Sequence, residues 1–197
     1  MASNTRVPET EITGIYGYLL KKMTRKMFGR VPASAGVMWH YPAVFKDMMG
    51  FGRKVDKWDR LDSNLASFAA MASAGLIGCS FCLDLNYFMA HNRGLDEAKV
   101  REVPRWRESG AFTPLERSVM AYAEAMSQTP PAVTDELSAA LLEGLGAAAL
   151  VELTARIAFM NASARANIAF GIHSEEYAAA CGLRPLATPR AAVLAPA

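Results

Sequence analysis

The chain has 197 residues, of which 52% are hydrophobic and 20% charged. A sequence this apolar is incompatible with intrinsic disorder, and its length suits one domain with a sizeable core. The 21 basic residues nearly balance the 19 acidic ones, so we expect no charged surface of the kind that binds nucleic acid. Three cysteines fit a reducing compartment better than a secreted disulfide scaffold, which predicts a cytoplasmic protein.

Apolar residues recur at helical spacing along the chain, whereas alternating runs of β-branched residues are absent. The sequence therefore predicts an all-α fold. The first helices are expected over residues 13–28 and 33–39, followed by one that ends near residue 55. Gly29 and the step from Val31 to Pro32 end the first of them.

Residues 63–83 carry no charge over a length that could span a bilayer. This segment is rich in alanine and serine and lacks a long block of leucine, isoleucine and valine. Such a composition favours a helix buried among other helices, so we expect no membrane insertion. The helix should begin with Asp62 as its N-cap and break around residues 75–78.

Two cysteines, Cys79 and Cys82, follow Gly78 at the start of the next expected helix, which runs to His91 and ends at Gly94. The amides and the dipole at a helix N-terminus favour a thiolate, and the second sulfur of such a pair can trap an oxidised first one as a disulfide. The spacing therefore indicates a redox dithiol. Two alternatives stay open on the residues alone: one half of a zinc site, or two buried cysteines that only fill space.

The second half of the chain also has helical spacing. A short helix is expected from residue 95 to Pro104, and residues 113–116 (Thr-Pro-Leu-Glu) combine an N-cap, a first-position proline and a capping-box glutamate. Further helices should begin near residue 134, run from 147 to 170, and run from 174 to 181. Residues 1–184 then form a single domain, and the Pro- and Ala-rich residues 185–197 a disordered tail.

Three polar residues interrupt the otherwise apolar helix expected over residues 147–170: Asn161, Arg165 and Asn167. Asn161 and Arg165 are four residues apart and share a helix face. They form either a structural hydrogen-bond network or the wall of a pocket for a polar substrate.

Four pieces of sequence, in this order, are typical of one family. They are Ile77-Gly78-Cys79-Ser80-Phe81-Cys82-Leu83-Asp84; Arg93-Gly94-Leu95; Ala111-Phe112-Thr113-Pro114-Leu115-Glu116-Arg117-Ser118-Val119; and Val151-Glu152-Leu153-Thr154 leading to Asn161, Arg165, Asn167 and Gly171. Over residues 65–172 the chain resembles the carboxymuconolactone decarboxylase-like superfamily, in particular its AhpD-like alkylhydroperoxidase branch. The resemblance implies a helical bundle that forms homo-oligomers, with the dithiol in a pocket near a subunit interface.

Peroxidases of that branch carry a glutamate before the cysteine pair and a histidine after it, with three residues in between. These two side chains relay protons to and from the thiols. Here Ser67 and Asn86 stand at those positions, and neither side chain is a base near pH 7. Only the cysteines carry over: the resemblance implies Cys82 as the attacking sulfur and Cys79 as the resolving one. At about 100° per residue, Asn86 shares a helix face with the pair and its amide could hydrogen-bond a sulfur.

His40 and His173 are imidazoles that folding could bring to the cysteines, and we keep His40 as a candidate supporting residue. His91 lies about 180° around the helix from Cys82, which places it on the opposite face. Asp84 also faces away, and its carboxylate is expected to favour the helix start. No metal site is expected, because the remaining histidines and the third cysteine are scattered along the sequence.

The leading hypothesis is an enzyme without a cofactor: a thiol-disulfide oxidoreductase of the AhpD-like alkylhydroperoxidase type, with a peroxiredoxin-type activity. A small hydroperoxide or other electrophile would oxidise Cys79 and Cys82, and a cellular thiol reductant would reduce them again. Two alternatives stay open. One is a non-catalytic redox-responsive or partner-binding oligomer, and the other a cofactor-free decarboxylase-type enzyme that acts on a small organic acid.

Overall fold

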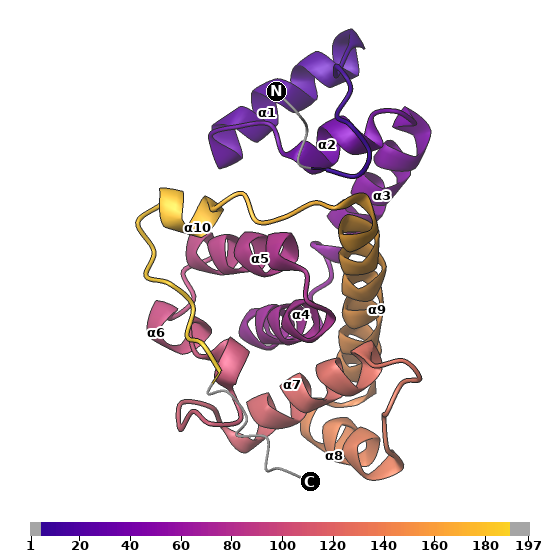
Figure 1. Ribbon diagram of the computed structural model, residues 1–197. Coiled ribbons are helices and arrows are strands. Elements are labelled where there is room, and N and C mark those ends of the chain that lie inside the picture. Colours follow the sequence, from indigo (N-terminus) through magenta and orange to yellow (C-terminus); the bar gives the residue numbers. More distant parts are fainter. Residues whose placement is uncertain (1–4, 190–197) are drawn as a thin grey trace, which may run out of the picture.

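The computed structural model describes residues 5–189, and all regular structure in that range is helical (Figure 1), which confirms the predicted all-α fold. In chain order the helices are α1 (Gly14–Phe28), α2 (Ala33–Met38), α3 (Pro42–Val55), α4 (Ser63–Ile77), α5 (Ser80–Asn92), α6 (Glu97–Val100), the 3-10 helix η1 (Val103–Arg105), α7 (Pro114–Ser127), α8 (Asp135–Leu145), α9 (Ala147–Phe170) and α10 (Tyr177–Ala180).

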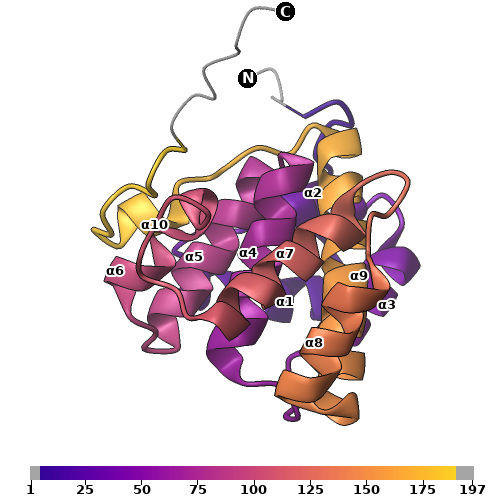
Figure 2. The same ribbon diagram turned by 90° about the horizontal axis from the view of Figure 1, so that it is seen from below.

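The uncharged helix α4 lies at the centre of the bundle and packs against α7, α9 and α5 (Figures 1 and 2). Nine of its 15 residues are buried, which explains why this segment carries no charge. Asp62 accepts hydrogen bonds from the amides of Asn64 and Leu65 and so caps the helix as predicted. No helix in residues 5–189 is both long enough and apolar enough to cross a membrane.

The segment α1–α3 forms one end of the molecule and has a small core of its own (Figure 1). Trp39 packs edge-on against Phe45 and stacks on Tyr16, beside the buried Ile12 and Leu20. Among the contacts of this end with the rest of the chain, Phe28 packs on the cluster around the cysteine pair, and Phe51 packs edge-on against Phe159 of α9.

The starts of α7 and α8 and the end of α9 agree with the sequence prediction. Thr113 Oγ1 accepts the Glu116 amide and the Glu116 carboxylate accepts the Thr113 amide, which completes the predicted capping box of α7. Thr134 caps α8, and Gly171, in the left-handed conformation at φ 72°, ends α9.

The predicted bounds of the last helix were wrong. The last helix covers only Tyr177–Ala180 instead of residues 174–181, because the Asp84 carboxylate binds the amides of Tyr177 and Ala178, and Glu176 adopts a left-handed φ of 58°. Residues 185–187 contact Arg101: its Nε donates to Pro185 O, and its backbone carbonyl accepts the amide of Ala187. The rest of the predicted disordered tail, residues 190–197, lies outside the described residues.

Candidate dithiol site

The cysteine pair lies at the junction between α4 and α5, which forms through local backbone bonds. Gly78 ends α4 at a φ of 83°, a left-handed conformation that glycine adopts without strain. The amides of Gly78 and Cys79 both donate to the carbonyl of Ala74, and Cys79 becomes the N-cap residue of α5. This turn starts a new helix directly at the first cysteine, as the sequence predicts.

The two sulfurs lie side by side and are joined in a disulfide, with the Cα atoms of Cys79 and Cys82 5.3 Å apart. The Cys79 sulfur accepts the backbone N–H of Cys82 at 3.2 Å, as a side chain does at a helix N-cap. The Cys82 sulfur accepts a hydrogen bond from Asn167 Nδ2 at 3.4 Å, so the last turn of α9 contributes to the site.

Both cysteines are buried, with 1% of Cys79 and 4% of Cys82 exposed. They belong to an apolar cluster that includes the buried residues Phe81, Phe88 and Tyr177 and draws residues from both ends of the chain. Two cavities were found in the described part of the chain, and the cysteines line neither of them. One of the two, with a volume of about 290 Å³, is lined by Ser80 and Leu83, which are sequence neighbours of the cysteines. Any reactant must therefore pass through the packed cover of this cluster.

The N-terminal segment contributes to that cover and is held on the end of α9. Arg6 donates its backbone amide to Phe170 O and its guanidinium to the carbonyls of Ile168 and Ala169. Val7 and the α1 residue Phe28 pack on the cysteine cluster next to this contact. The same turn of α9 thus carries both the sulfur contact and the attachment of the N-terminus.

The C-terminal segment is hydrogen-bonded to Asp84 of α5. Its carboxylate accepts from Ser174 Oγ and from the amides of Tyr177 and Ala178. The prediction that Asp84 serves the start of its own helix is therefore wrong, because these three donors from a distant segment occupy it. Burial and the Glu175 carboxylate beside it raise the pKa of the Tyr177 hydroxyl well above its ordinary value.

The predicted supporting residues do not touch the sulfurs. Asn86 donates to the carbonyl oxygen of Cys82 at 2.7 Å rather than to a sulfur atom. His40 Nε2 is 2.8 Å from the carbonyl oxygen of Pro8 at an exposed position, and His173 is exposed. Within residues 5–189, the sulfurs receive hydrogen bonds only from Cys82 N and Asn167 Nδ2, so neither a histidine nor a carboxylate replaces the relay.

Ser67, which stands where peroxidases of the resembled branch carry the glutamate, is also without a role at the sulfurs. It is 4% exposed, and its hydroxyl is the one buried side-chain oxygen or nitrogen atom of the described chain that lacks a hydrogen-bond partner. A buried hydroxyl without a hydrogen-bond partner is energetically unfavourable.

The contact between Asn167 and Cys82 was missed by sequence reasoning, although Asn167 stood out as a polar residue on an apolar helix. Its partner is 85 residues away in sequence, and no helical periodicity connects the two. The related residue Asn161 does form a structural network: it donates to Ser73 Oγ and Ser127 Oγ, and Arg165 donates to the carbonyl of Ser127. This network ties α4, α7 and α9 together.

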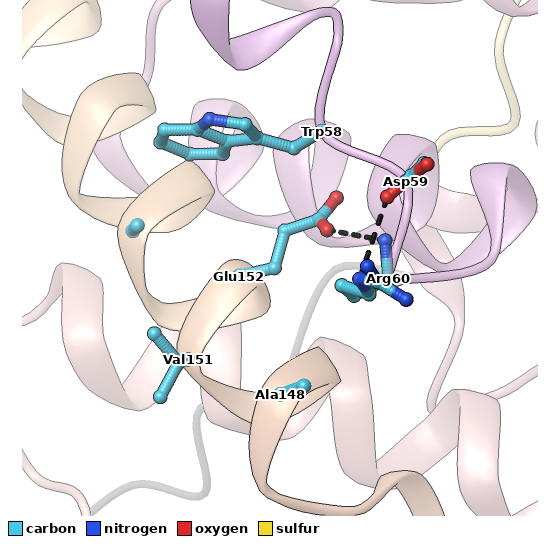
Figure 3. A pocket seen from close by; sticks show the side chains of 7 residues that line it. Trp58, Asp59, Arg60, Ala148, Val151 and Glu152 are labelled. Atoms are coloured by element: carbon cyan, nitrogen blue, oxygen red, sulfur yellow. Dashed lines mark hydrogen bonds and ion pairs between the residues drawn. The ribbon is translucent and has the colours of Figure 1, made fainter.

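A separate cavity of about 300 Å³ beside Trp58 is lined by the buried carboxylate of Glu152 (Figure 3). Glu152, only 6% exposed, accepts the amides of Arg60 and Leu61 and pairs with the guanidinium of Arg156. Both carboxylate oxygens are therefore occupied, and Glu152 anchors the loop before α4 to α9. No group of three or more His, Cys, Asp and Glu side chains among residues 5–189 could hold a metal ion.

The chain is thus an all-helical bundle with a Cys-x-x-Cys pair at the start of α5. Residues 42–125 match the carboxymuconolactone decarboxylase family. The chain is 34% identical over 152 residues to the uncharacterized protein YnjA of Escherichia coli (strain K12), a stretch that covers 77% of this chain and 84% of YnjA. The chain therefore belongs to the carboxymuconolactone decarboxylase family, as the sequence motifs indicated.

Solved structures show the same fold at low sequence identity. The debrominase Bmp8, in a Cys-to-Ala variant bound to 2,3,4-tribromopyrrole, superposes with a TM-score of 0.79 at 21% identity and covers 91% of this chain and 97% of its own. An AhpD-core, uncharacterized peroxidase-related protein from Ralstonia eutropha JMP134 gives a TM-score of 0.78 at 16% identity over 90% of this chain and 96% of its own. These likenesses confirm the AhpD-like helical fold.

Proposed function

We propose that the protein is a thiol-disulfide oxidoreductase that uses Cys79 and Cys82 to reduce a small hydroperoxide. The supporting observation is that the two sulfurs lie side by side at the N-terminus of α5 and are bonded to each other. A disulfide between residues three apart at a helix start is the oxidised form that a dithiol of this type must reach in each cycle.

The reaction consumes two electrons from the dithiol. The Cys82 thiolate attacks the terminal peroxide oxygen, the O–O bond breaks, and the alkoxide leaves and takes up a proton to become an alcohol. Cys82 is now a sulfenic acid. The Cys79 thiol attacks its sulfur, an S–S bond forms and water leaves. In sum, one hydroperoxide and two thiols give one alcohol, one water and one disulfide.

Regeneration requires a reductant, which we propose to be a cellular dithiol. Its two thiols are oxidised to a disulfide while Cys79 and Cys82 return to thiols, so protons and electrons balance. We place this cycle in the cytoplasm, where reduced thiols are supplied continuously, and in a homo-oligomer of this chain.

A halogenated aromatic ring is the second candidate substrate. The aromatic side chains of Phe28, Phe81 and Phe88 lie in the cysteine cluster or pack on it, and Bmp8, whose fold is similar, is a debrominase. Oxidation of the two thiols to the disulfide would supply two electrons. The bromine of an aryl bromide would then be replaced by hydrogen, and bromide and a proton would be released.

A thiol titration of the native protein tests the proposal. A Cys181→Ser variant removes the exposed third cysteine, so that only the pair is counted. We expect the reduced protein to lose two thiols per equivalent of hydroperoxide and to regain them with dithiothreitol. Bromide release from a bromopyrrole, measured with the same variant, tests the second candidate. If the pair reacts with either oxidant only after denaturation, the cysteines are packing residues and the proposal is wrong.

A further inference from the structure

The two sulfurs of the pair differ in where their hydrogen-bond donors come from. The donor to Cys79 is an amide of the same turn, so it is present whenever α5 is formed. The donor to Cys82 is the side-chain amide of Asn167, which the fold brings from the last turn of α9. Only the second donor can be removed by a side-chain substitution while the backbone of the pair stays intact.

We propose that Asn167 stabilises the thiolate form of Cys82 and thereby makes Cys82 the reactive sulfur of the pair. This inference rests on the proposed function and names a residue to which neither the family resemblance nor the comparisons assign a role. A thiolate that is 96% buried needs a donor, because transfer of an unpaired charge into an apolar cluster is strongly unfavourable. The Asn167 amide supplies a donor that carries no charge and does not titrate.

The position of Asn167 is fixed by the end of α9. Its carbonyl accepts the amide of Ile172, and Gly171 between them adopts the left-handed conformation that closes the helix. Arg6 binds the carbonyls of Ile168 and Ala169 in the same turn. These bonds fix the backbone of the turn from which the Asn167 amide reaches the sulfur of Cys82.

The charged groups around the cysteine cluster are engaged elsewhere. The Tyr177 hydroxyl donates to Glu175, and the guanidinium of Arg30 lies over the Tyr177 ring. Asp84 accepts three donors from the C-terminal segment, and Arg6 donates to carbonyls of α9. None of these groups hydrogen-bonds to a sulfur, so the effect of Asn167 on Cys82 can be measured without a second titrating partner in contact with it.

The experiment measures thiol pKa values from thiolate absorbance at 240 nm in reduced protein that carries Cys181→Ser. Cys79→Ser leaves Cys82 as the titrating thiol, and Cys82→Ser leaves Cys79. In the first background, Asn167→Leu should raise the pKa of Cys82 by about one unit, the effect of losing one hydrogen bond to a charged group. In the second background, the same substitution should leave the pKa of Cys79 unchanged.

Two further variants keep the test decisive. Asn167→Asp has nearly the volume of asparagine but places carboxylate oxygens at the sulfur, so it should raise the pKa of Cys82 at least as much as leucine does. Asn86→Ala is the matched control, because Asn86 bonds to the carbonyl of Cys82 and not to its sulfur. Far-UV circular dichroism of each variant identifies any that does not fold. The pKa of Cys82 in whichever of Asn167→Leu and Asn167→Asp is folded then tests the inference.

An unchanged pKa of Cys82 in a folded Asn167 variant, or equal shifts of Cys79 and Cys82, would overturn the inference. This result is separate from a failure of the proposed function, because the titration needs no substrate. If peroxide does not oxidise the pair but Asn167→Leu raises the pKa of Cys82 alone, the hydrogen bond is established and the oxidoreductase proposal falls.

Discussion

At the scale of single residues, the site combines one local and one distant contact. The amide of Cys82 reaches the sulfur of Cys79 because both belong to the first turn of α5, a relation that the spacing of the two cysteines already contains. Asn167 reaches the sulfur of Cys82 from the far end of another helix. The closeness of the two sulfurs could therefore be predicted from the sequence, whereas the environment of each sulfur could not.

The roles that we propose for the two cysteines lead to a first prediction. Cys79→Ser removes the resolving sulfur, so treatment with one equivalent of hydroperoxide should leave a sulfenic acid on Cys82 that a dimedone-type probe captures. Cys82→Ser should give no such adduct at Cys79. The mass of the labelled peptide distinguishes the sites, and equal labelling in both variants would show that the roles are not divided.

The buried hydroxyl of Tyr177 leads to a prediction about alkaline pH. Burial, together with the neighbouring Glu175 carboxylate, raises its pKa in the folded protein above the ordinary value of 10.0. A group whose pKa is raised by folding contributes stability that is complete below its unfolded pKa and is lost as the pH rises above it. The free energy of unfolding should therefore fall above about pH 10, and less steeply in Tyr177→Phe. Urea titrations between pH 8 and 11 measure the two slopes, and parallel curves would contradict the assignment.

At the scale of helices, the chain places its start and stop signals accurately. Asp62, Thr113 and Thr134 cap the helices that the sequence assigned to them, and Gly78 and Gly171 end theirs in the left-handed conformation. These signals act between residues at most four apart, so they are readable in the sequence. The last helix was the exception, because Asp84 from α5 takes the amides that would have extended it.

The capping box of α7 gives a prediction about stability. Thr113→Ala removes the oxygen that accepts the Glu116 amide and should reduce the free energy of unfolding by about 1 kcal/mol. Thr113→Ser keeps a hydroxyl at the same place and should cost much less. Equilibrium unfolding in urea at pH 7 compares the two variants. A loss of the same size in both would mean that the methyl group of Thr113, and not the cap, supplies the stability.

The contact between the N-terminal segment and α9 gives a prediction about access to the dithiol. Arg6→Ala removes the guanidinium bonds to Ile168 O and Ala169 O and loosens the segment that covers the cysteine cluster. The reduced pair should then react several-fold faster with iodoacetamide, because local opening governs the reaction of buried groups. Lys22→Ala removes an exposed cation of α1 and is the matched control. Unchanged rates in Arg6→Ala would show that reactants enter by another route.

At the scale of the whole molecule, the disulfide closes a loop of only four residues, so it constrains the unfolded chain little. The chain-entropy estimate for such a loop is about 2 kcal/mol, a small part of what a core of this size supplies. The main core, around Phe68, Met71 and Met120, does not depend on the pair. A dithiol that alternates between reduced and oxidised forms requires a protein that stays folded when the disulfide is reduced.

Reduction should therefore leave the helical content unchanged and lower Tm by only about 4–8 °C. Circular dichroism with and without dithiothreitol, in the Cys181→Ser background, measures both quantities. If the reduced protein unfolded at room temperature, the disulfide would be a structural element of the fold, and redox cycling of the native protein would be ruled out.

The sequence by itself determined the helices other than the last one, the caps of α4, α7 and α8, the family and the position of the cysteine pair, because each depends on spacing or on contacts within a few residues. The tertiary structure decided which groups contact the sulfurs, namely Asn167 and an apolar cluster. It also decided that His40 contacts the carbonyl of Pro8 and Asn86 the carbonyl of Cys82, and that neither hydrogen-bonds to a sulfur. Burial and contacts between distant segments arise only when several helices pack together, and no local pattern records them.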